Sequence, residues 1–226
     1  MELFIKELSV HYTNFDLDVH NLSFQKGMNM IIGGNGSGKS TLLNGIIGYE
    51  FKRRSVRFND EQLVLNRDVT YLPQNLNRPD MTIKDFTELT SSKNSDDLLK
   101  QFDLYHLKNL SCLNVSGGEF KRAAFVQAVL EDKPILILDE IEQGLDIKYR
   151  KEIFHYIKEL SKERVVILNV HDLSLVLSFA DKIFGMKKGK VNVTTLPNDI
   201  TADNLSDIFN VPLEITTYNG KRLIVL

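Results

Sequence analysis

A glycine-rich segment followed by lysine and serine is the first feature of this sequence that could perform chemistry. Residues Gly33-Gly34-Asn35-Gly36-Ser37-Gly38-Lys39-Ser40 fit the pattern G-x-x-x-x-G-K-[ST]. Glycine permits the tight turn that points successive amides inward, where they bind phosphate oxygens. Lys39 would neutralise the β and γ phosphates of a nucleotide, and the Ser40 hydroxyl would ligate Mg²⁺. A plain glycine-rich turn is the alternative, but Lys and Ser in register favour a nucleotide site.

Two acidic residues directly follow a short apolar segment, Ile135-Leu136-Ile137-Leu138-Asp139-Glu140. The carboxyl ends of parallel strands are where open α/β sheets bind ligands. Asp139 is suited to hold Mg²⁺, usually through water, and Glu140 could polarise a water in line with the γ-phosphorus as general base. A strand that ends in solvated acids is the plain alternative. The phosphate loop upstream favours the functional interpretation.

A third pattern, Ser116-Gly117-Gly118-Glu119, precedes an apolar helical stretch. Ser and Glu at this spacing form a capping box, which contributes about 1 kcal/mol. The two glycines add nothing to a cap, but they suit a backbone that approaches an anion closely at a helix N-terminus. The chain therefore carries a second phosphate-directed element, and one nucleotide cannot easily need both from the same subunit.

The elements that must position these residues follow from the apolar pattern. Alternating apolar residues up to residue 19 and the run 28–32 predict strands, and the spacing after Ser40 predicts a helix that ends at Gly48. Residues 51–71 return to strand character. Between about residues 73 and 115, Val, Ile and Thr thin out, which indicates a small, mostly helical insert.

After the insert, helix and strand patterns alternate, which predicts a mostly parallel sheet flanked by helices. The expected helices are 119–130 and 147–161, and the expected strands are 135–138 and 165–170. A short helix near 203–209 and a hairpin that turns at Asn219-Gly220 would end the chain.

Composition is that of an ordinary globular protein. Lys plus Arg total 28 against 30 Asp plus Glu, so the net charge is 28 − 30 = −2, without the basic footprint of a nucleic-acid binder. Apolar residues at 42% and charged residues at 26% exclude a disordered chain. The apolar runs are far shorter than the roughly 18 residues of a bilayer span. The N-terminus lacks a secretory pattern, and the single Cys112 agrees with a reducing cytosol.

The order of the motifs resembles the ATP-binding cassette (ABC) ATPase family from about Leu3 to Val193. The motifs are the phosphate loop, Gln74, Ser116-Gly117-Gly118-Glu119, Asp139-Glu140, Gly144-Leu145-Asp146 and His171-Asp172. The resemblance implies an α/β fold, with a P-loop NTPase (RecA-like) core, an N-terminal antiparallel β-subdomain and a small helical insert. In that family two cassettes face head to tail, so Ser116 and Gly118 would contact the γ-phosphate that the partner subunit's Lys39 holds.

The resemblance also implies roles for four residues outside the phosphate loop. Tyr12 would stack on adenine, Gln74 would reach Mg²⁺ and the attacking water, and His171 would hydrogen-bond the γ-phosphate. Asp146 would help couple the two sites, and it could also cap the following helix. Tyr12 could instead be a half-exposed strand tyrosine. Taken together, the residues and the resemblance predict that Glu140, His171 and Gln74 are catalytic and that Mg²⁺ is bound by Ser40, Gln74 and Asp139. They also predict that ATP is bound by Tyr12, Gly33, Gly34, Asn35, Gly36, Ser37, Gly38, Lys39, Ser40, Thr41, Ser116, Gly117, Gly118, Glu119 and Asp146.

The sequence departs from the family pattern at several positions. Lys121 replaces the usual Gln, Val115 replaces a commoner Leu, and Ile141-Glu142-Gln143 stands where many members have Pro-Thr-Ser. None of these changes removes a catalytic group. The insert between Gln74 and Ser116 is short for many importers, which leaves the identity of the membrane partner open.

The resemblance implies an ATP-hydrolysing subunit of a multi-subunit transporter, working as a head-to-tail homodimer on separate permease subunits. Residues 171–183 are similar to bacterial importer cassettes, and residues 200–211 to those for iron-siderophore, haem or cobalamin uptake. An exporter cassette and a soluble, cofactor-assembly cassette are the alternatives. We expect an extracytoplasmic substrate-binding protein as a partner, no nucleic acid, and a cytoplasmic location on the inner face of the membrane. The expected domains are a cassette over 1–195, with its insert at about 75–118, and an extension over 196–226.

Overall fold

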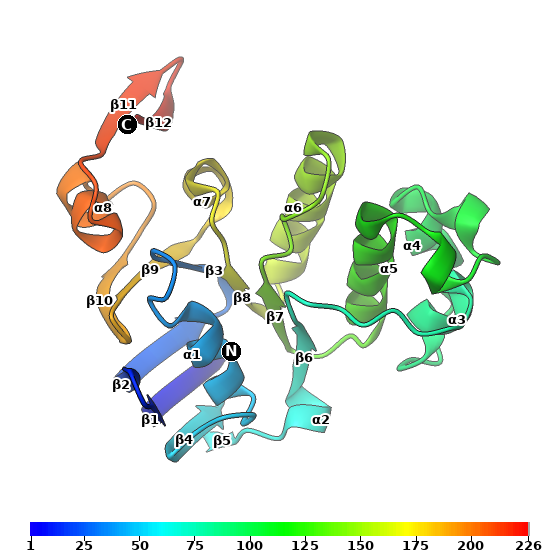
Figure 1. Ribbon diagram of the computed structural model, residues 1–226, viewed down its shortest axis with the longest axis horizontal. Helices are drawn as coiled ribbons and strands as arrows, with labels where there is room; N and C mark the ends of the chain where they lie inside the picture. Colours follow the sequence, from blue (N-terminus) through cyan, green and yellow to red (C-terminus); the bar gives the residue numbers. More distant parts are fainter. Residues whose placement is uncertain (226) are drawn as a thin grey trace.

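A six-stranded sheet forms the centre of the protein in the computed structural model, which describes residues 1–225 (Figure 1). Its strands are β3 (Gly27–Ile32), β6 (Val69–Leu72), β7 (Ile135–Asp139), β8 (Val165–Asn169), β9 (Lys182–Lys187) and β10 (Lys190–Thr195). The strand order is β10-β9-β3-β8-β7-β6, and all neighbours are parallel except β9 and β10. The carboxyl ends of β3, β8 and β7 therefore meet at one edge of the sheet, where ligands bind in open α/β folds.

A second, antiparallel sheet stands beside the first and encloses helix α1 (Lys39–Ile46) between them. Its strands, in the order β2-β1-β4-β5, are β1 (Glu2–Tyr12), β2 (Phe15–Gln25), β4 (Arg53–Phe58) and β5 (Glu61–Gln62). Leu42 and Ile46 of α1 share one buried cluster with Leu8 of β1 and Ile31 of β3. Helix α1 packs closely on β1 at Gly45, where an added Cβ atom would lie only 2.9 Å from Leu8 Cδ2.

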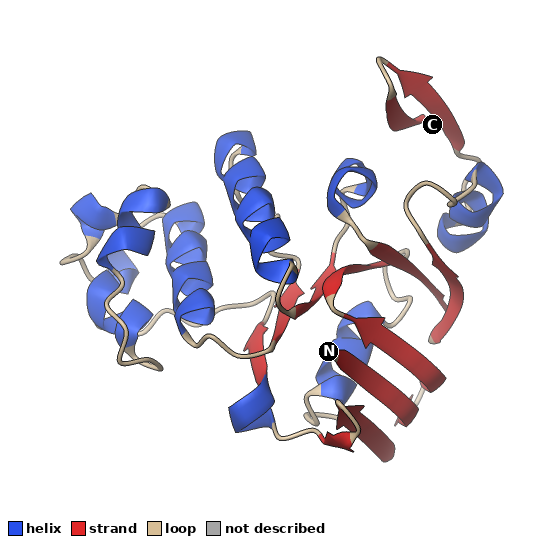
Figure 2. Ribbon diagram, turned by 180° about the vertical axis from the view of Figure 1, so that it is seen from behind, coloured by secondary structure: helices blue, strands red, loops and turns tan. Residues whose placement is uncertain are grey.

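Helices cover the other face of the central sheet (Figure 2). They are α5 (Gly117–Leu130), α6 (Ile147–Ser161) and α7 (Leu173–Phe179). Met28, Met30 and Ile32 point to these helices, whereas Ile31 points to α1, as the period of two along a strand requires. Each face of the sheet is therefore buried, which is why its strands are continuously apolar.

Short helices form the insert that packs on α5. They are α3 (Ile83–Glu88), α4 (Asp96–Gln101) and the 3₁₀ turns η1 (Tyr105–Leu107) and η2 (Cys112–Asn114). Aromatic pairs join insert and helix, with 5.1 Å between the ring centroids of Phe86 and Phe120 and 5.4 Å for Phe102 and Phe125. The insert and α5 therefore share one apolar core, so a displacement of the insert would move the N-terminus of α5.

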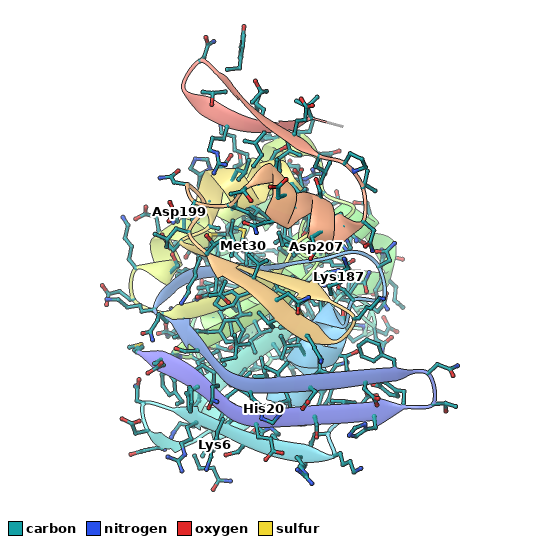
Figure 3. All side chains as sticks on the ribbon, turned by 90° about the vertical axis from the view of Figure 1, so that its left-hand side faces the viewer. Lys6, His20, Met30, Lys187, Asp199 and Asp207 are labelled. Carbon is teal, nitrogen blue, oxygen red and sulfur yellow. The ribbon has the colours of Figure 1, made fainter. Side chains whose placement is uncertain are left out.

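The C-terminal segment contains helix α8 (Ala202–Phe209) and a hairpin of β11 (Glu214–Tyr218) and β12 (Lys221–Val225). Lys187 of β9 donates to a carboxylate oxygen of Asp207 in α8 over 2.7 Å, and Figure 3 shows these residues side by side. Arg222 of β12 donates to the carbonyl of Ile200 over 2.5 Å. The turn residues Asn219 and Gly220 have φ of 47° and 73°, so the expected type I′ hairpin forms.

The expected α/β fold class is confirmed. Helix α6 has the predicted bounds, whereas α5 begins at Gly117, two residues earlier than expected. The sequence analysis assigned no elements to α7, β9 and β10, and it missed helix α2 (Leu65–Asp68). Helices of four and seven residues are too short to show a clear helical period. Within residues 1–225, no helix combines the length and the apolar character that a bilayer span requires.

Candidate active site

The phosphate loop connects β3 to α1 as the sequence predicted. The Lys39 ammonium lies over this loop and donates to the carbonyls of Gly33 over 2.8 Å and of Gly34 over 3.2 Å. Burial lowers the pKa of Lys39 from its ordinary value, and the carboxylates of Glu140 and Asp139 oppose that shift. A buried cation above a glycine-rich loop is a candidate for binding an anion.

The glycines of the loop serve two different purposes. A Cβ atom at Gly33 would lie 2.5 Å from the Met186 carbonyl, and one at Gly38 would lie 2.6 Å from Phe15 Cζ. These two glycines are required because the loop packs against neighbouring backbone and an aromatic ring. At Gly34 and Gly36 a Cβ atom would meet no described atom within 4 Å, so these positions border open space above the loop.

Ser40 and Asp139 lie together beneath the loop. The Ser40 hydroxyl is 3.4 Å from Asp139 Oδ1, and the buried Asn169 amide donates to the same oxygen over 2.6 Å. Burial raises the pKa of the Asp139 carboxyl. Hydroxyl and carboxylate oxygens are ligands that Mg²⁺ prefers, and it usually completes its shell with water and phosphate. The described chain contains no cluster of three or more His, Cys, Asp or Glu that could hold a metal ion.

The Glu140 carboxylate is the centre of the site and receives hydrogen bonds from four side chains. His171 Nε2 lies 2.7 Å from Oε1, and Gln74 Nε2 donates to Oε2 over 2.5 Å. Asn169 lies 3.4 Å from Oε1, and the amide of Gln143 donates to Oε2. Glu140 has φ of 53°, a left-handed conformation that is uncommon for a residue with a side chain and typical of functional sites.

Further contacts fix the segment that carries Glu140. The Lys121 ammonium donates to the carbonyls of Glu140 over 2.7 Å and of Gln143 over 2.8 Å. The buried Glu142 carboxylate accepts the backbone amide of His171 over 2.8 Å. Burial raises the pKa of Glu142 and lowers that of Lys121. Three of the positions where the sequence departs from the family pattern, Lys121, Glu142 and Gln143, therefore make specific contacts here.

The segment Ser116–Glu119 forms the predicted capping box at the N-terminus of α5. Ser116 accepts the amide of Glu119 over 3.3 Å, and Glu119 accepts the amide of Ser116 over 2.6 Å. A Cβ atom at Gly118 would lie 3.2 Å from the Gly144 carbonyl, so one of the two glycines also has a packing role. The hollow above the phosphate loop is lined by residues 35–41, Glu140 and His171, and within residues 1–225 the capping segment is not part of its lining.

The other two expected residues lie at the margins of the site. Tyr12, at the end of β1, is 45% exposed and lines a shallow hollow together with Phe15, Gly36 and Thr41. The ring is therefore free to stack on a base beside the phosphate loop. Asp146 occupies the N-cap position of α6, but its side chain accepts no capping hydrogen bond from the described residues. Asp146 is therefore the N-cap residue of α6, as one of its two expected roles requires, but its exposed carboxylate makes no capping hydrogen bond within residues 1–225.

Sequence reasoning missed two residues that contact the acids, Asn169 and Gln143. Asn169 is the one polar residue of the buried strand β8, and a fully buried amide needs partners. The sequence therefore shows that Asn169 needs partners. Which groups these are depends on the order of the strands, which places β8 beside β7. Gln143 gave no comparable signal, because a loop sequence does not show that a side chain turns back to the carboxylate three residues before it.

The phosphate loop at the carboxyl edge of a parallel sheet, with an acid pair at the end of β7 on the same edge, defines a nucleotide-binding cassette. The sequence profile described as ABC transporter matches residues 17–143. The chain is 32% identical over 196 residues to the zinc import ATP-binding protein ZnuC of Buchnera aphidicola, covering 81% of this chain and 80% of that protein. It is 26% identical over 253 residues to the "Probable iron chelatin transport ATP-binding protein" of Helicobacter pylori, covering 99% of each.

A solved structure supports the same fold. The structure described as "An inward-facing conformation of a putative metal-chelate type ABC transporter" matches with a TM-score of 0.79 at 19% identity, covering 98% of this chain and 95% of that chain. Since the family profile matches more than half of the sequence, the chain belongs to the ABC transporter family. It is an ATP-binding subunit of an ABC transporter and an ATPase whose activity is coupled to transport.

Proposed function

We propose that this ATPase hydrolyses ATP with Glu140 as general base. The observation that supports the assignment is the Glu140 carboxylate at the rim of the phosphate-loop hollow, with His171 at 2.7 Å and Gln74 at 2.5 Å. In this position the carboxylate can accept a proton from a water that attacks the γ-phosphorus. His171 then hydrogen-bonds the γ-phosphate, and Gln74 orients the water.

The phosphates are held by the loop in this proposal. Its backbone amides and the N-terminus of α1 bind phosphate oxygens, and Lys39 neutralises the β and γ phosphates. Tyr12 stacks on the adenine, which contributes about 1–3 kcal/mol. Ser40, Asp139 and Gln74 would hold Mg²⁺, which neutralises charge that develops on the phosphates. The remaining assigned loop residues, Asn35, Ser37 and Thr41, line the same hollow.

We also propose a head-to-tail homodimer with two composite sites. The capping segment Ser116–Glu119 is an anion-directed helix N-terminus that does not line the hollow of its own subunit in the described chain. It is therefore available to bind the γ-phosphate held by a second copy. The exposed, uncapped Asp146 would couple the two sites across the same interface.

The biological role that we propose is nutrient import. The two named relatives are a zinc import and an iron chelatin transport ATP-binding protein, and the structural neighbour is of the metal-chelate type. We infer that this chain drives a permease pair which imports a metal chelate delivered by an extracytoplasmic binding protein. The chain would lie on the cytoplasmic face of the membrane as a cassette over 1–195 and an extension over 196–226.

The substitution Glu140→Gln tests the catalytic assignment. Removing the base should lower kcat by a factor of about 100 or more, while the affinity for ATP remains within about threefold of the wild type. The same variant should form a dimer in ATP and Mg²⁺ that sediments at twice the monomer mass. Normal turnover would refute the base assignment, and a monomer in saturating ATP would refute the composite site.

Copurification from membranes tests the transport role. An affinity-tagged chain, expressed in its own host and extracted in mild detergent, should bring down a polytopic permease in stoichiometric amounts. The permease should dissociate when the insert is disrupted, for which Phe86→Asp is a suitable variant because Phe86 joins the insert to α5. A set of partners without any membrane protein would favour the soluble cofactor-assembly alternative.

A further inference from the structure

The Glu140 carboxylate has two kinds of hydrogen-bond partner. Gln74 and His171, in the proposed mechanism, turn to the water and the γ-phosphate when ATP binds. Asn169 and Gln143 have no assigned role toward the nucleotide. A carboxylate has about four lone-pair positions, and these four side chains occupy them. After ATP binds, Asn169 and Gln143 are the donors that would remain to hold Glu140.

Asn169 and Gln143 differ in how far they can move. Asn169 is fully buried in β8, and its amide also donates to Asp139, so its position is fixed by the sheet. Gln143 is an exposed residue of the otherwise largely buried turn between β7 and α6, three residues after Glu140. This turn also contains Gly144, the residue against which Gly118 of the capping segment packs. A movement of α5 would therefore reach Gln143 directly.

Lys121 links α5 directly to the turn that contains Gln143. Its side chain extends from α5, two residues after the capping segment, and its ammonium donates to the carbonyls of Glu140 and Gln143 in the turn. The backbone amide of Gln143 also donates to the Glu140 carbonyl over 3.2 Å. The turn is thus held in one conformation by α5, and these contacts maintain the strained, left-handed φ of Glu140.

We propose that Gln143 is a positioning residue that holds the Glu140 carboxylate in its reactive orientation, and that Lys121 anchors Gln143 to α5. This inference rests on the proposed role of Glu140 as base. In the composite site, α5 presents Ser116 to the ATP of the second subunit, while Lys121 on the same helix fixes the base for the ATP of its own subunit. Closure on one nucleotide would therefore orient the base for the other.

The test replaces Gln143 with Met, which keeps the length of the side chain and removes the amide donor. We expect kcat to fall at least tenfold while the KM for ATP stays within about threefold, because the base is misplaced but the phosphate loop is unchanged. Gln143 is exposed, so thermal unfolding without nucleotide should be unaffected. The matched control is Gln62→Met, an exposed glutamine at the edge of the antiparallel sheet, which should retain full activity.

Combining the substitution with Glu140→Gln separates positioning from other effects. If Gln143 acts only through Glu140, the double variant should have the same residual rate as Glu140→Gln alone, so the two losses are not additive. Lys121→Met should reproduce the loss in kcat at unchanged KM. Wild-type kcat in Gln143→Met, a loss confined to KM, or an additive loss in the double variant would overturn the inference.

The role of Glu140 as base and the role of Gln143 in positioning it can be tested separately. Full turnover by Glu140→Gln alone would remove the base assignment and the inference with it. A dead Glu140→Gln protein together with an active Gln143→Met protein would leave the base in place and remove only the role of Gln143.

Discussion

At the scale of single residues, the site is a set of buried polar groups that depend on one another. Asp139 and Glu140 are almost fully enclosed, which disfavours a charged carboxylate unless donors surround it. Asn169 supplies donors to both acids from the adjacent strand. A buried amide that bridges two carboxylates replaces the water that each has lost on folding. Removing the Asn169 amide should therefore lower both the free energy of unfolding and the rate of ATP hydrolysis.

The substitution Asn169→Leu should show both effects. Loss of the amide leaves two buried acids with fewer donors, so we expect the free energy of unfolding in urea to fall by about 1–3 kcal/mol. The rate of the folded enzyme should fall at least tenfold, because Glu140 and Asp139 are no longer held. The control is Asn29→Leu, a buried amide in β3 whose partners are backbone carbonyls. The Asn29→Leu variant should lose a similar amount of stability and keep its kcat. Equal activity of the two variants would contradict the role of Asn169 as a bridge between the two acids.

At the scale of elements, the N-terminus of α5 combines a cap with a tight contact. The capping box accounts for Ser116 and Glu119, and a Cβ atom at Gly118 would make a tight contact of 3.2 Å with the Gly144 carbonyl. Gly117 has more room, since its nearest neighbour would be the flexible end of Arg78 at 3.7 Å. The sequence analysis attributed both glycines to ligand approach. The structure gives one of them a packing reason as well.

Alanine at each glycine distinguishes these reasons. Without nucleotide, Gly118→Ala should lower the free energy of unfolding by about 1 kcal/mol, because the Gly144 carbonyl must move by a few tenths of an ångström. Gly117→Ala should be neutral or stabilising by about 0.5 kcal/mol, since alanine favours the helix. Chemical denaturation of both variants measures the difference. Equal stability of the two would mean that the contact between α5 and the turn at Gly144 is loose.

At the scale of the whole molecule, Gly189 joins three parts of the chain. It lies in the turn between β9 and β10, donates to the Ser37 carbonyl of the phosphate loop over 2.9 Å and accepts the Asp18 amide of β2 over 3.1 Å. A Cβ atom there would lie 1.8 Å from the Asp16 carbonyl. The position of the antiparallel sheet relative to the phosphate loop thus depends on one residue without a side chain.

The substitution Gly189→Ala should therefore disturb both stability and nucleotide binding. We expect a loss of about 2–4 kcal/mol from the clash and the left-handed φ of 73°, with weaker ATP binding measured by titration calorimetry. The control is Gly220→Ala, which has the same φ but no described atom within 4 Å. It should cost only about 1 kcal/mol and leave ATP affinity unchanged. Similar losses of stability in both variants would mean that only the left-handed φ matters at Gly189, and not its close contacts with β2 and the phosphate loop.

Local patterns in the sequence determined a large part of this protein. The bounds of α6, those of β3 and β7 to within one residue, the phosphate loop, the acid pair, the capping box and the type I′ turn all follow from neighbouring residues. Periodicity, capping and turn chemistry act within a few positions. Short elements such as α2 and α7 were missed because tertiary packing, and not their own period, stabilises them.

Contacts between distant segments were decided only by the tertiary structure. The order β3-β8-β7 places Asn169 beside Asp139 and Glu140, and the approach of α5 to the following turn brings Lys121 to the carbonyls of Glu140 and Gln143. A hydrogen bond depends on distance and direction between groups, and residue types along the chain do not specify either for segments that fold back from far away. The sequence therefore determined which groups perform the chemistry, and the packing of sheet and helices determined how they are held.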